Sequence, residues 1–191
     1  MADRTSSRRE RFDALFAGDP DPWNFKTSSY EREKRAHTID ALDGKHFRKG
    51  LEIGCATGVL TRNLAEICDQ IIGIDVSERA LSIAKDELHG CRNIDLLQGE
   101  IPRDWPAGSF DLIVFSEVLY FLNAPEIRTS SKFANRSLLS NGFVLLINWI
   151  GPNDLPLNGH EVVHLFMEAC KWERDCVMIA PQFRIDRFRK R

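Results

Sequence analysis

The segment over residues 50–75 constrains the fold of this chain more than any other part. It reads as an apolar strand (51–53), a glycine-bracketed turn, a helix-forming run, and a second apolar strand (71–74) that ends on Asp75. Two strands joined through a helix are parallel neighbours in one sheet, and open parallel sheets bind ligands at the carboxyl ends of their strands. The segment therefore predicts an α/β fold with a ligand site at the turn after residue 53.

The turn indicates which kind of nucleotide this site would accept. A dinucleotide fingerprint needs G-x-G-x-x-G so that backbone amides approach a pyrophosphate, and this chain has Gly54, Ala56 and Val59 at the three glycine positions. Asp75 is the kind of acid that accepts hydrogen bonds from the ribose diol of any adenosine-type ligand. The sequence thus favours an adenosine-type ligand and leaves an NAD-linked oxidoreductase as a weaker alternative.

The same turn resembles motif I of the class I S-adenosylmethionine-dependent methyltransferases, E/D-x-G-x-G-x-G. Glu52, Gly54, Ala56 and Gly58 occupy its positions, with Ala56 in place of the middle glycine. The resemblance implies that the cofactor is S-adenosyl-L-methionine and that the product is S-adenosyl-L-homocysteine. It also implies a doubly wound, mostly parallel, seven-stranded sheet of Rossmann-like type.

Downstream of Asp75 the alternation of helix and strand continues. A helix from Ser77 to Gly90 and a strand over 94–98 lead into the turn-rich loop GEIPRDWPAGSFD. In class I methyltransferases an acidic residue at this place accepts from the adenine amine. The resemblance therefore assigns that role to Glu100.

The most uniformly apolar run, 110–116, is typical of a central strand covered on both faces. Glu117 and Tyr120 follow it, at the same edge as the turn at Gly54, where a methyl acceptor would approach. Methyl transfer to an amine needs a free lone pair, so Glu117 is a candidate to remove the ammonium proton and Tyr120 to orient the amine. The N/D-P-P-Y/F string of enzymes that methylate nucleobase amines is absent, which favours an aliphatic amine or a hydroxyl acceptor.

The amino-terminal part is expected to form a leader and a helical cap. Residues 1–11 are polar and basic, and we expect them to be mobile and without a role in chemistry. Over 12–46, two prolines and Trp23 break one helix before a serine, Ser28 or Ser29, caps another. A helix before the first strand commonly packs over the ligand edge of the sheet.

The cap also carries a narrower resemblance. Its segments DPWNF and SSYEREKR, with LEIGCATG, GIDVS, GEIP and SEVLYFL, resemble the NodS family of nodulation N-methyltransferases over residues 12–149. This implies methyl transfer to the free amine at the non-reducing end of a de-N-acetylated chitooligosaccharide; another small amine or hydroxyl acceptor is the alternative. The residues expected around the cofactor are Trp23, Tyr30, Arg35, Glu52, Gly54, Cys55, Ala56, Gly58, Asp75, Val76, Glu100, Ile101 and Glu117.

The string HEVVH over 160–164 suggests a competing function. It matches H-E-x-x-H, in which two histidines bind zinc in metalloproteases and the glutamate is the general base. No glycine-spaced third ligand follows, so we expect no metal and place His160 in the acceptor pocket, as a third catalytic candidate. The last part, 171–191, reads as two edge strands around 180–182, and its basic end alternates with apolar residues as in a strand with one solvated face.

Length and composition set the remaining limits. At 191 residues with 43% hydrophobic residues and a net charge of -2, the chain fits one domain, 1–191, with no general attraction to nucleic acid. No apolar run reaches the roughly 18 residues of a membrane span, and the start lacks the apolar core of a signal peptide. Five cysteines without C-x-x-C spacing suit reduced thiols. We expect a cytoplasmic protein without membrane partners, with a monomer favoured.

Overall fold

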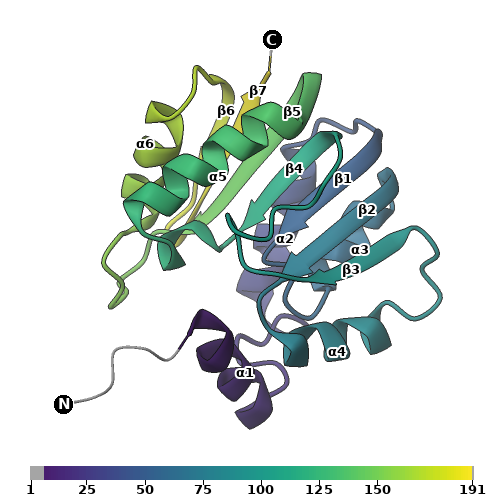
Figure 1. The fold of residues 1–191 in the computed structure, drawn as a ribbon. Helices are drawn as coiled ribbons and strands as arrows, with labels where there is room; N and C mark the ends of the chain where they lie inside the picture. Colours follow the sequence, from purple (N-terminus) through teal and green to yellow (C-terminus); the bar gives the residue numbers. More distant parts are fainter. Residues whose placement is uncertain (1–6, 191) are drawn as a thin grey trace.

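The computed structural model describes residues 7–190 and consists of a central sheet with helices on both sides (Figure 1). Two helices precede the sheet, α1 (Arg8–Gly18) and α2 (Ser29–Asp40). The strands are β1 (Phe47–Ile53), β2 (Cys68–Asp75), β3 (Ile94–Gln98), β4 (Phe110–Ser116), β5 (Leu138–Trp149), β6 (Glu173–Ile179) and β7 (Phe183–Arg189). Between them lie α3 (Val59–Ala65), α4 (Glu78–Glu87), the 3-10 turn η1 (Leu119–Phe121), α5 (Ala124–Ser137) and α6 (Gly159–Glu168).

The sheet has the strand order β3-β2-β1-β4-β5-β7-β6. Strands β1 to β5 pair in parallel, and β7 is antiparallel to both of its neighbours. Ile53 at the end of β1 stands opposite Ile74 of β2 and Phe115 of β4, so these strands end at one edge of the sheet. The predicted doubly wound, mostly parallel, seven-stranded fold is confirmed for the described residues.

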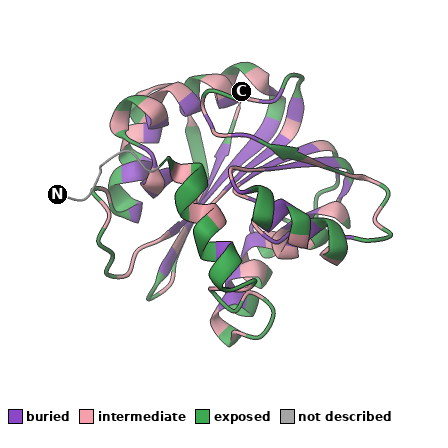
Figure 2. Cartoon of the chain, turned by 60° about the horizontal axis from the view of Figure 1, so that its bottom comes forward, coloured by how far each residue is buried: buried purple, intermediate pink, exposed green. Residues whose placement is uncertain are grey.

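Two apolar layers cover the sheet. On one face α5, α6 and η1 contribute Ile127, Phe166 and Leu119 to a cluster with inward residues of the strands. On the other face, Leu42 in the turn after α2 and Leu64 of α3 pack against the opposite side of the same strands. The inner strands are therefore mostly buried, whereas the edge strands β3 and β6 and the outer surfaces of the helices are largely exposed (Figure 2).

The amino-terminal leader is shorter than predicted. Residues 1–6 lie outside the described residues, but Ser7 caps α1, which begins at Arg8. The side chain of Ser7 accepts from the backbone N–H of Glu10, and the Glu10 carboxylate accepts from the backbone N–H of Ser7. This capping box supplies partners for two free N–H groups, which explains why a polar, basic sequence is helical here.

The prediction of two edge strands at the carboxyl-terminal end was wrong for the second strand. β7 lies between β5 and β6, and only β6 is at the edge. The alternating arginines of β7 are not all solvated, because the Arg187 side chain is 9% exposed and pairs with Asp43 and Asp175. Its guanidinium also donates to the carbonyl of Ala41 at 2.6 Å and so ties β7 to the end of α2.

None of the five cysteines forms a disulfide, which agrees with the predicted reduced thiols. Cys55 and Cys68 are buried, and the other three are half-buried. Within residues 7–190 we find no helix whose length and apolar character would let it cross a membrane.

The position of β7 can be tested through Arg187. We expect Arg187→Met to lower the free energy of unfolding by about 1–3 kcal/mol, because it leaves two carboxylates and a buried carbonyl without their donor. Urea denaturation would measure the difference. The control is Arg189→Met, at the exposed end of the same strand, with an expected change below about 0.5 kcal/mol. Equal effects of the two substitutions would contradict the internal position of Arg187.

Candidate functional site

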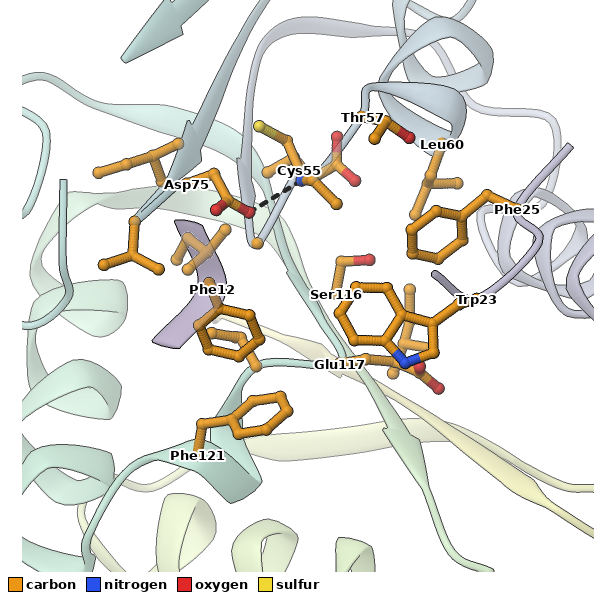
Figure 3. Close-up of a pocket in the computed structure, with 18 of the residues that line it drawn as sticks. Phe12, Trp23, Phe25, Cys55, Thr57, Leu60, Asp75, Ser116, Glu117 and Phe121 are labelled. Carbon is orange, nitrogen blue, oxygen red and sulfur yellow. Dashed lines mark hydrogen bonds between the residues drawn. The ribbon is translucent and has the colours of Figure 1, made fainter. Parts of the chain in front are cut away.

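A cavity of about 170 Å³ lies at the edge where β1, β2 and β4 end. The turn after β1, the loop after β3 and the start of η1 form its floor, and α1, α2 and the loop between them form its cover. Much of the cover is aromatic. Figure 3 labels Phe12, Trp23 and Phe25 of this cover, together with Phe121 of η1 and Asp75, around the cavity.

The turn after β1 brings the backbone close to this cavity. Gly54 has a φ of 82°, and a Cβ there would lie 2.8 Å from the carbonyl oxygen of Ser116, so glycine is required for the approach of β1 to β4. Ala56 has a φ of 46°, a conformation that disfavours side chains with a Cβ. The substitution of the middle motif glycine has therefore not changed the left-handed course of the turn.

The carboxylate of Asp75 connects the turn to the next helix. Oδ2 accepts from the backbone N–H of Ala56 at 2.9 Å, the bond dashed in Figure 3. Oδ1 accepts from the backbone N–H of Ser77, also at 2.9 Å. Burial raises the pKa of Asp75, while these N–H donors act in the opposite direction. Each carboxylate oxygen can still accept a further hydrogen bond, so the residue can hold the turn and bind a hydroxyl-bearing ligand together.

Glu52 lies at the base of the cavity. Its Oε2 accepts from the Thr61 hydroxyl at 2.6 Å, whereas Oε1 is buried without a hydrogen-bond partner. Burial raises the pKa of Glu52 to about 8. A buried carboxylate oxygen without a partner is costly, and a cation or a donor in the cavity would remove that cost.

A cluster of three charged residues forms the side of the cavity next to α2. Lys34 Nζ donates to Glu31 Oε1 at 2.9 Å and lies 3.0 Å from Glu117 Oε2. Glu117 Oε1 is buried without a hydrogen-bond partner. Burial raises the pKa of Glu117, and the Lys34 ammonium opposes this rise.

Two tyrosines adjoin these charges. Tyr120 lines the cavity, and burial together with the Glu117 carboxylate raises its pKa far above the ordinary value, so its phenol keeps the proton. Tyr30 packs beside the cluster, with Lys34 Nζ 5.0 Å from its ring centroid, and its buried hydroxyl has no partner. It does not line the cavity.

Helix α1 contributes residues that the sequence analysis missed. Arg8 lines the cavity and pairs with both Glu100 and Glu126. The Phe12 ring meets the Phe121 ring edge-on at a centroid distance of 5.0 Å. The Ser7-x-x-Glu10 capping box and the spacing of Phe12 and Phe16 were the signals that could have predicted this helix.

The structure brings most of the predicted site residues together and separates three from them. The predicted residues that line the cavity are Trp23, Arg35, Glu52, Gly54, Cys55, Ala56, Asp75, Val76, Glu100, Ile101, Glu117 and Tyr120. Tyr30, Gly58 and His160 do not. Gly58 instead allows close packing of α3 on α4, because a Cβ there would lie 2.8 Å from the Leu88 side chain.

The expected position of His160 in the acceptor pocket was wrong. His160 is exposed at the start of α6, and Arg184 lies 3.0 Å from its Nδ1. His164 is exposed as well and lies 3.1 Å from Glu168. The two imidazoles of HEVVH thus have separate partners, and among residues 7–190 no group of three His, Cys, Asp or Glu side chains is arranged to hold a metal ion.

The cavity combines aromatic walls with carboxylates from the ends of three strands. Asp75, Glu52 and Glu117 come from or directly follow β2, β1 and β4. This arrangement suits a ligand with an apolar or aromatic part, neighbouring hydroxyls and a positive charge. The free oxygen of Glu117 is positioned to accept a proton or a hydrogen bond from a second ligand.

Comparison with protein families gives a match over most of the chain. The family model described as Nodulation protein S (NodS) matches residues 13–142. Nodulation protein S of Sinorhizobium fredii is 31% identical over 112 residues, which are 58% of this chain and 52% of the relative. That of Bradyrhizobium diazoefficiens is 34% identical over 104 residues, which are 53% and 49% of the two chains. The chain therefore spans about half the length of the curated relatives that it matches.

Solved structures resemble the chain over more of its length. The N-methyltransferase NodS from Bradyrhizobium japonicum WM9, in complex with S-adenosyl-L-homocysteine, has a TM-score of 0.80 and 27% identity. The similarity covers 94% of this chain and 97% of that one. A Pseudomonas syringae protein assigned to the methyltransferases has a TM-score of 0.76 and 34% identity, over 85% and 100% of the two chains.

The burial of Glu52 predicts a dependence of stability on pH. Its pKa of about 8 in the folded chain exceeds the ordinary 4.5, so between these values the folded state holds a proton that the unfolded state has released. Its contribution to stability is therefore present below about pH 4.5 and is lost as the pH rises toward 8. We expect Glu52→Gln to flatten this decline, which for one group amounts to at most about 1.4 kcal/mol per pH unit.

Urea denaturation between pH 5 and pH 8.5 would measure this slope for both proteins. Asp75 and Glu117 contribute to the wild-type slope and remain in the variant, so only the difference between the two slopes reports on Glu52. Identical slopes would contradict the raised pKa.

Proposed function

This chain belongs to the Nodulation protein S (NodS) family, and we propose that it is an S-adenosylmethionine-dependent N-methyltransferase. The observation that carries the proposal is the convergence of three strand-end carboxylates in one aromatic cavity. All three line the cavity, and in our proposal Asp75 binds a ribose, Glu52 a cation and Glu117 a second substrate. The complex of the NodS structure with S-adenosyl-L-homocysteine supports this choice of cofactor.

The residues of the cavity fit this cofactor in their chemistry. Asp75 would accept from the ribose hydroxyls while it continues to hold the backbone of the turn. The unpaired Oε1 of Glu52 would accept from the ammonium of the methionine part, and this cation would favour the ionised form of a carboxyl group whose pKa is about 8 in the free protein. Glu100 would accept from the adenine amine, and its pairing with Arg8 keeps its carboxylate at the cavity.

The cofactor supplies a methyl group on a positively charged sulfur. The chain itself has to orient the acceptor and remove a proton from it. In our proposal the acceptor ammonium donates its proton to Glu117 Oε1, which frees the nitrogen lone pair. Tyr120 stays protonated and orients the nitrogen through its phenol, and the aromatic cover limits the access of water.

The proposed acceptor is the free amine at the non-reducing end of a de-N-acetylated chitooligosaccharide, in the synthesis of nodulation factors. Membership of the NodS family supports this choice, and Trp23, 41% exposed at the cavity, offers an apolar face for a sugar ring. Another small amine or a hydroxyl compound is the alternative acceptor. The proposal includes a cytoplasmic location and a monomer that binds neither nucleic acid nor a membrane.

The proposed cofactor role of Asp75 can be tested by substitution. We expect Asp75→Ala to weaken the binding of S-adenosylmethionine and S-adenosylhomocysteine at least tenfold, because hydrogen bonds to a charged group contribute about 1.5–3 kcal/mol each. Isothermal titration calorimetry would measure both affinities. Asp69→Ala, at the exposed opposite end of β2, is the control and should leave them unchanged. Unchanged affinity in Asp75→Ala, or binding of NADH in place of S-adenosylmethionine, would count against the assignment.

The acceptor class can be tested with methyl-labelled S-adenosylmethionine and a panel of acceptors. The panel would contain glucosamine oligomers, small amines, hydroxyl compounds and proteins, with fully N-acetylated oligomers as the matched control. We expect label in the oligomers with a free amine and none in the acetylated ones, since an amide nitrogen lacks a basic lone pair. Label in protein alone would refute the saccharide acceptor.

A further inference from the structure

Lys34 on α2 is the only cation that contacts Glu117 among the described residues, and the chemistry above gives it no role. We propose that Lys34 is a positioning residue, which keeps Glu117 ionised and fixes its Oε2 so that Oε1 faces the acceptor amine. This inference rests on the proposed function. It assigns a specific task to a residue that does not itself exchange a proton with the substrate.

The contacts of Lys34 leave its side chain little freedom. Its ammonium pairs with Glu31 at 2.9 Å and with Glu117 at 3.0 Å, and its third neighbour is the Tyr30 ring at 5.0 Å. The side chain is 7% exposed. An ammonium with partners on three sides cannot turn toward a ligand without breaking an ion pair, so its effect on a ligand must act through Glu117.

The charges of the cluster explain why two carboxylates surround one ammonium. The charges of Lys34 and Glu31 cancel, so the carboxylate of Glu117 gives the cluster of these three residues a net charge of -1. Two adjacent buried carboxylates without a cation would favour protonation of one of them. Lys34 removes this tendency, and the remaining negative charge attracts a cationic acceptor. A salt bridge that served stability alone would not require the second carboxylate.

Glu117 itself has features of a residue held for function. Its backbone is left-handed, with a φ of 53°, which is costly for a side chain with a Cβ. Lys34 occupies Oε2 while Oε1 is left buried and unpaired beside the cavity. Such a group is costly in the free protein, and a donor on the acceptor would satisfy it.

The groups that act on Glu117 come from two elements. Helix α2 provides Tyr30, Glu31 and Lys34, and η1 provides Tyr120. Burial raises the pKa of Glu117 and the Glu31 carboxylate raises it further, whereas Lys34 and, as the smallest effect, the Tyr120 hydroxyl lower it. Without Lys34, burial and the charge of Glu31 would favour the protonated form of Glu117, and only the Tyr120 hydroxyl would oppose them. The protonated form cannot accept a proton from an ammonium.

The proton balance is simple. The acceptor ammonium gives one proton to Glu117, which becomes a neutral carboxylic acid, and the electron pair stays on nitrogen. That pair forms the new N–C bond, and the pair of the S–C bond stays on sulfur. Lys34 keeps its charge throughout and pairs with Glu31 while Glu117 is neutral.

The test compares Lys34→Met with Lys34→Met/Glu31→Gln by pH profiles of kcat with S-adenosylmethionine and a glucosamine tetramer. The single substitution leaves two buried carboxylates unpaired and can unfold the chain, whereas the double substitution leaves Glu117 alone and restores the net charge of -1. We expect the rising limb of the double variant to move at least one pH unit upward, with at least a tenfold loss of kcat at pH 7 that recovers at higher pH. Lys34→Arg should restore most of the wild-type profile.

Arg32→Met, exposed on the same helix, is the control and should change neither the profile nor the thermal stability. If the double variant has the stability and the profile of the wild type, Lys34 serves only to balance Glu31, and the inference is overturned. The inference is also overturned if kcat of the double variant falls while the rising limb of its pH profile stays at the wild-type position.

Infrared spectroscopy of the protein without substrates provides a readout that does not need activity. At pH 7 the protonated Glu52 contributes a carboxyl band in every variant. We expect a second, additional band in Lys34→Met/Glu31→Gln that Glu31→Gln lacks, and the loss of this second band on the further change Glu117→Gln. If the expected band does not appear, the inference is overturned, even when the variant is an active enzyme. A wild type that methylates no amine, with the band pattern as expected, would refute the proposed function and leave the ionisation of Glu117 by Lys34 in place.

Discussion

The double hydrogen bond from two backbone amides to Asp75 is the contact on which the site depends. Through it, the end of β2 fixes both the turn after β1 and the first residue before α4. The same turn runs between β1 and Ser116 at the end of β4, where only a glycine fits at position 54. Strand pairing aligns the three strand ends, while one carboxylate and one glycine determine the course of the turn that runs between them.

Buried carboxylates are the main electrostatic feature of this cavity. Burial raises the pKa of Glu52, Asp75 and Glu117, and each of the three has a different compensating contact. The Thr61 hydroxyl donates to Glu52, backbone N–H groups donate to Asp75, and the Lys34 ammonium pairs with Glu117. These contacts suit three different tasks. Glu52 keeps one oxygen free for a cation, Asp75 is held by the backbone at the turn, and Glu117 is kept ionised by an ammonium.

Local patterns were sufficient to predict the parallel part of the sheet and the residues at the floor of the cavity. Strand periodicity and the spacing from Glu52 to Asp75 are short-range properties, and the structure follows them. The cover of the cavity could not be predicted in this way, because it depends on ion pairs between residues far apart in the sequence. Arg8 pairs with Glu100 and Glu126, and Lys34 pairs with Glu117. The alternating arginines of β7 suggested a solvated face because sequence periodicity does not reveal that Arg187 has buried partners.

The order of the last strands also bears on how the chain is made. β5 is apolar along most of its length. It pairs with β4 on one edge and with β7 on the other, and β7 follows β6 in the sequence. During synthesis, one edge of β5 thus stays without its strand partner until residues 183–189 have left the ribosome. An unpaired apolar edge is open to pairing with other chains. We expect the nascent chain, in contrast to the finished protein, to be the form most prone to aggregation and most dependent on chaperones.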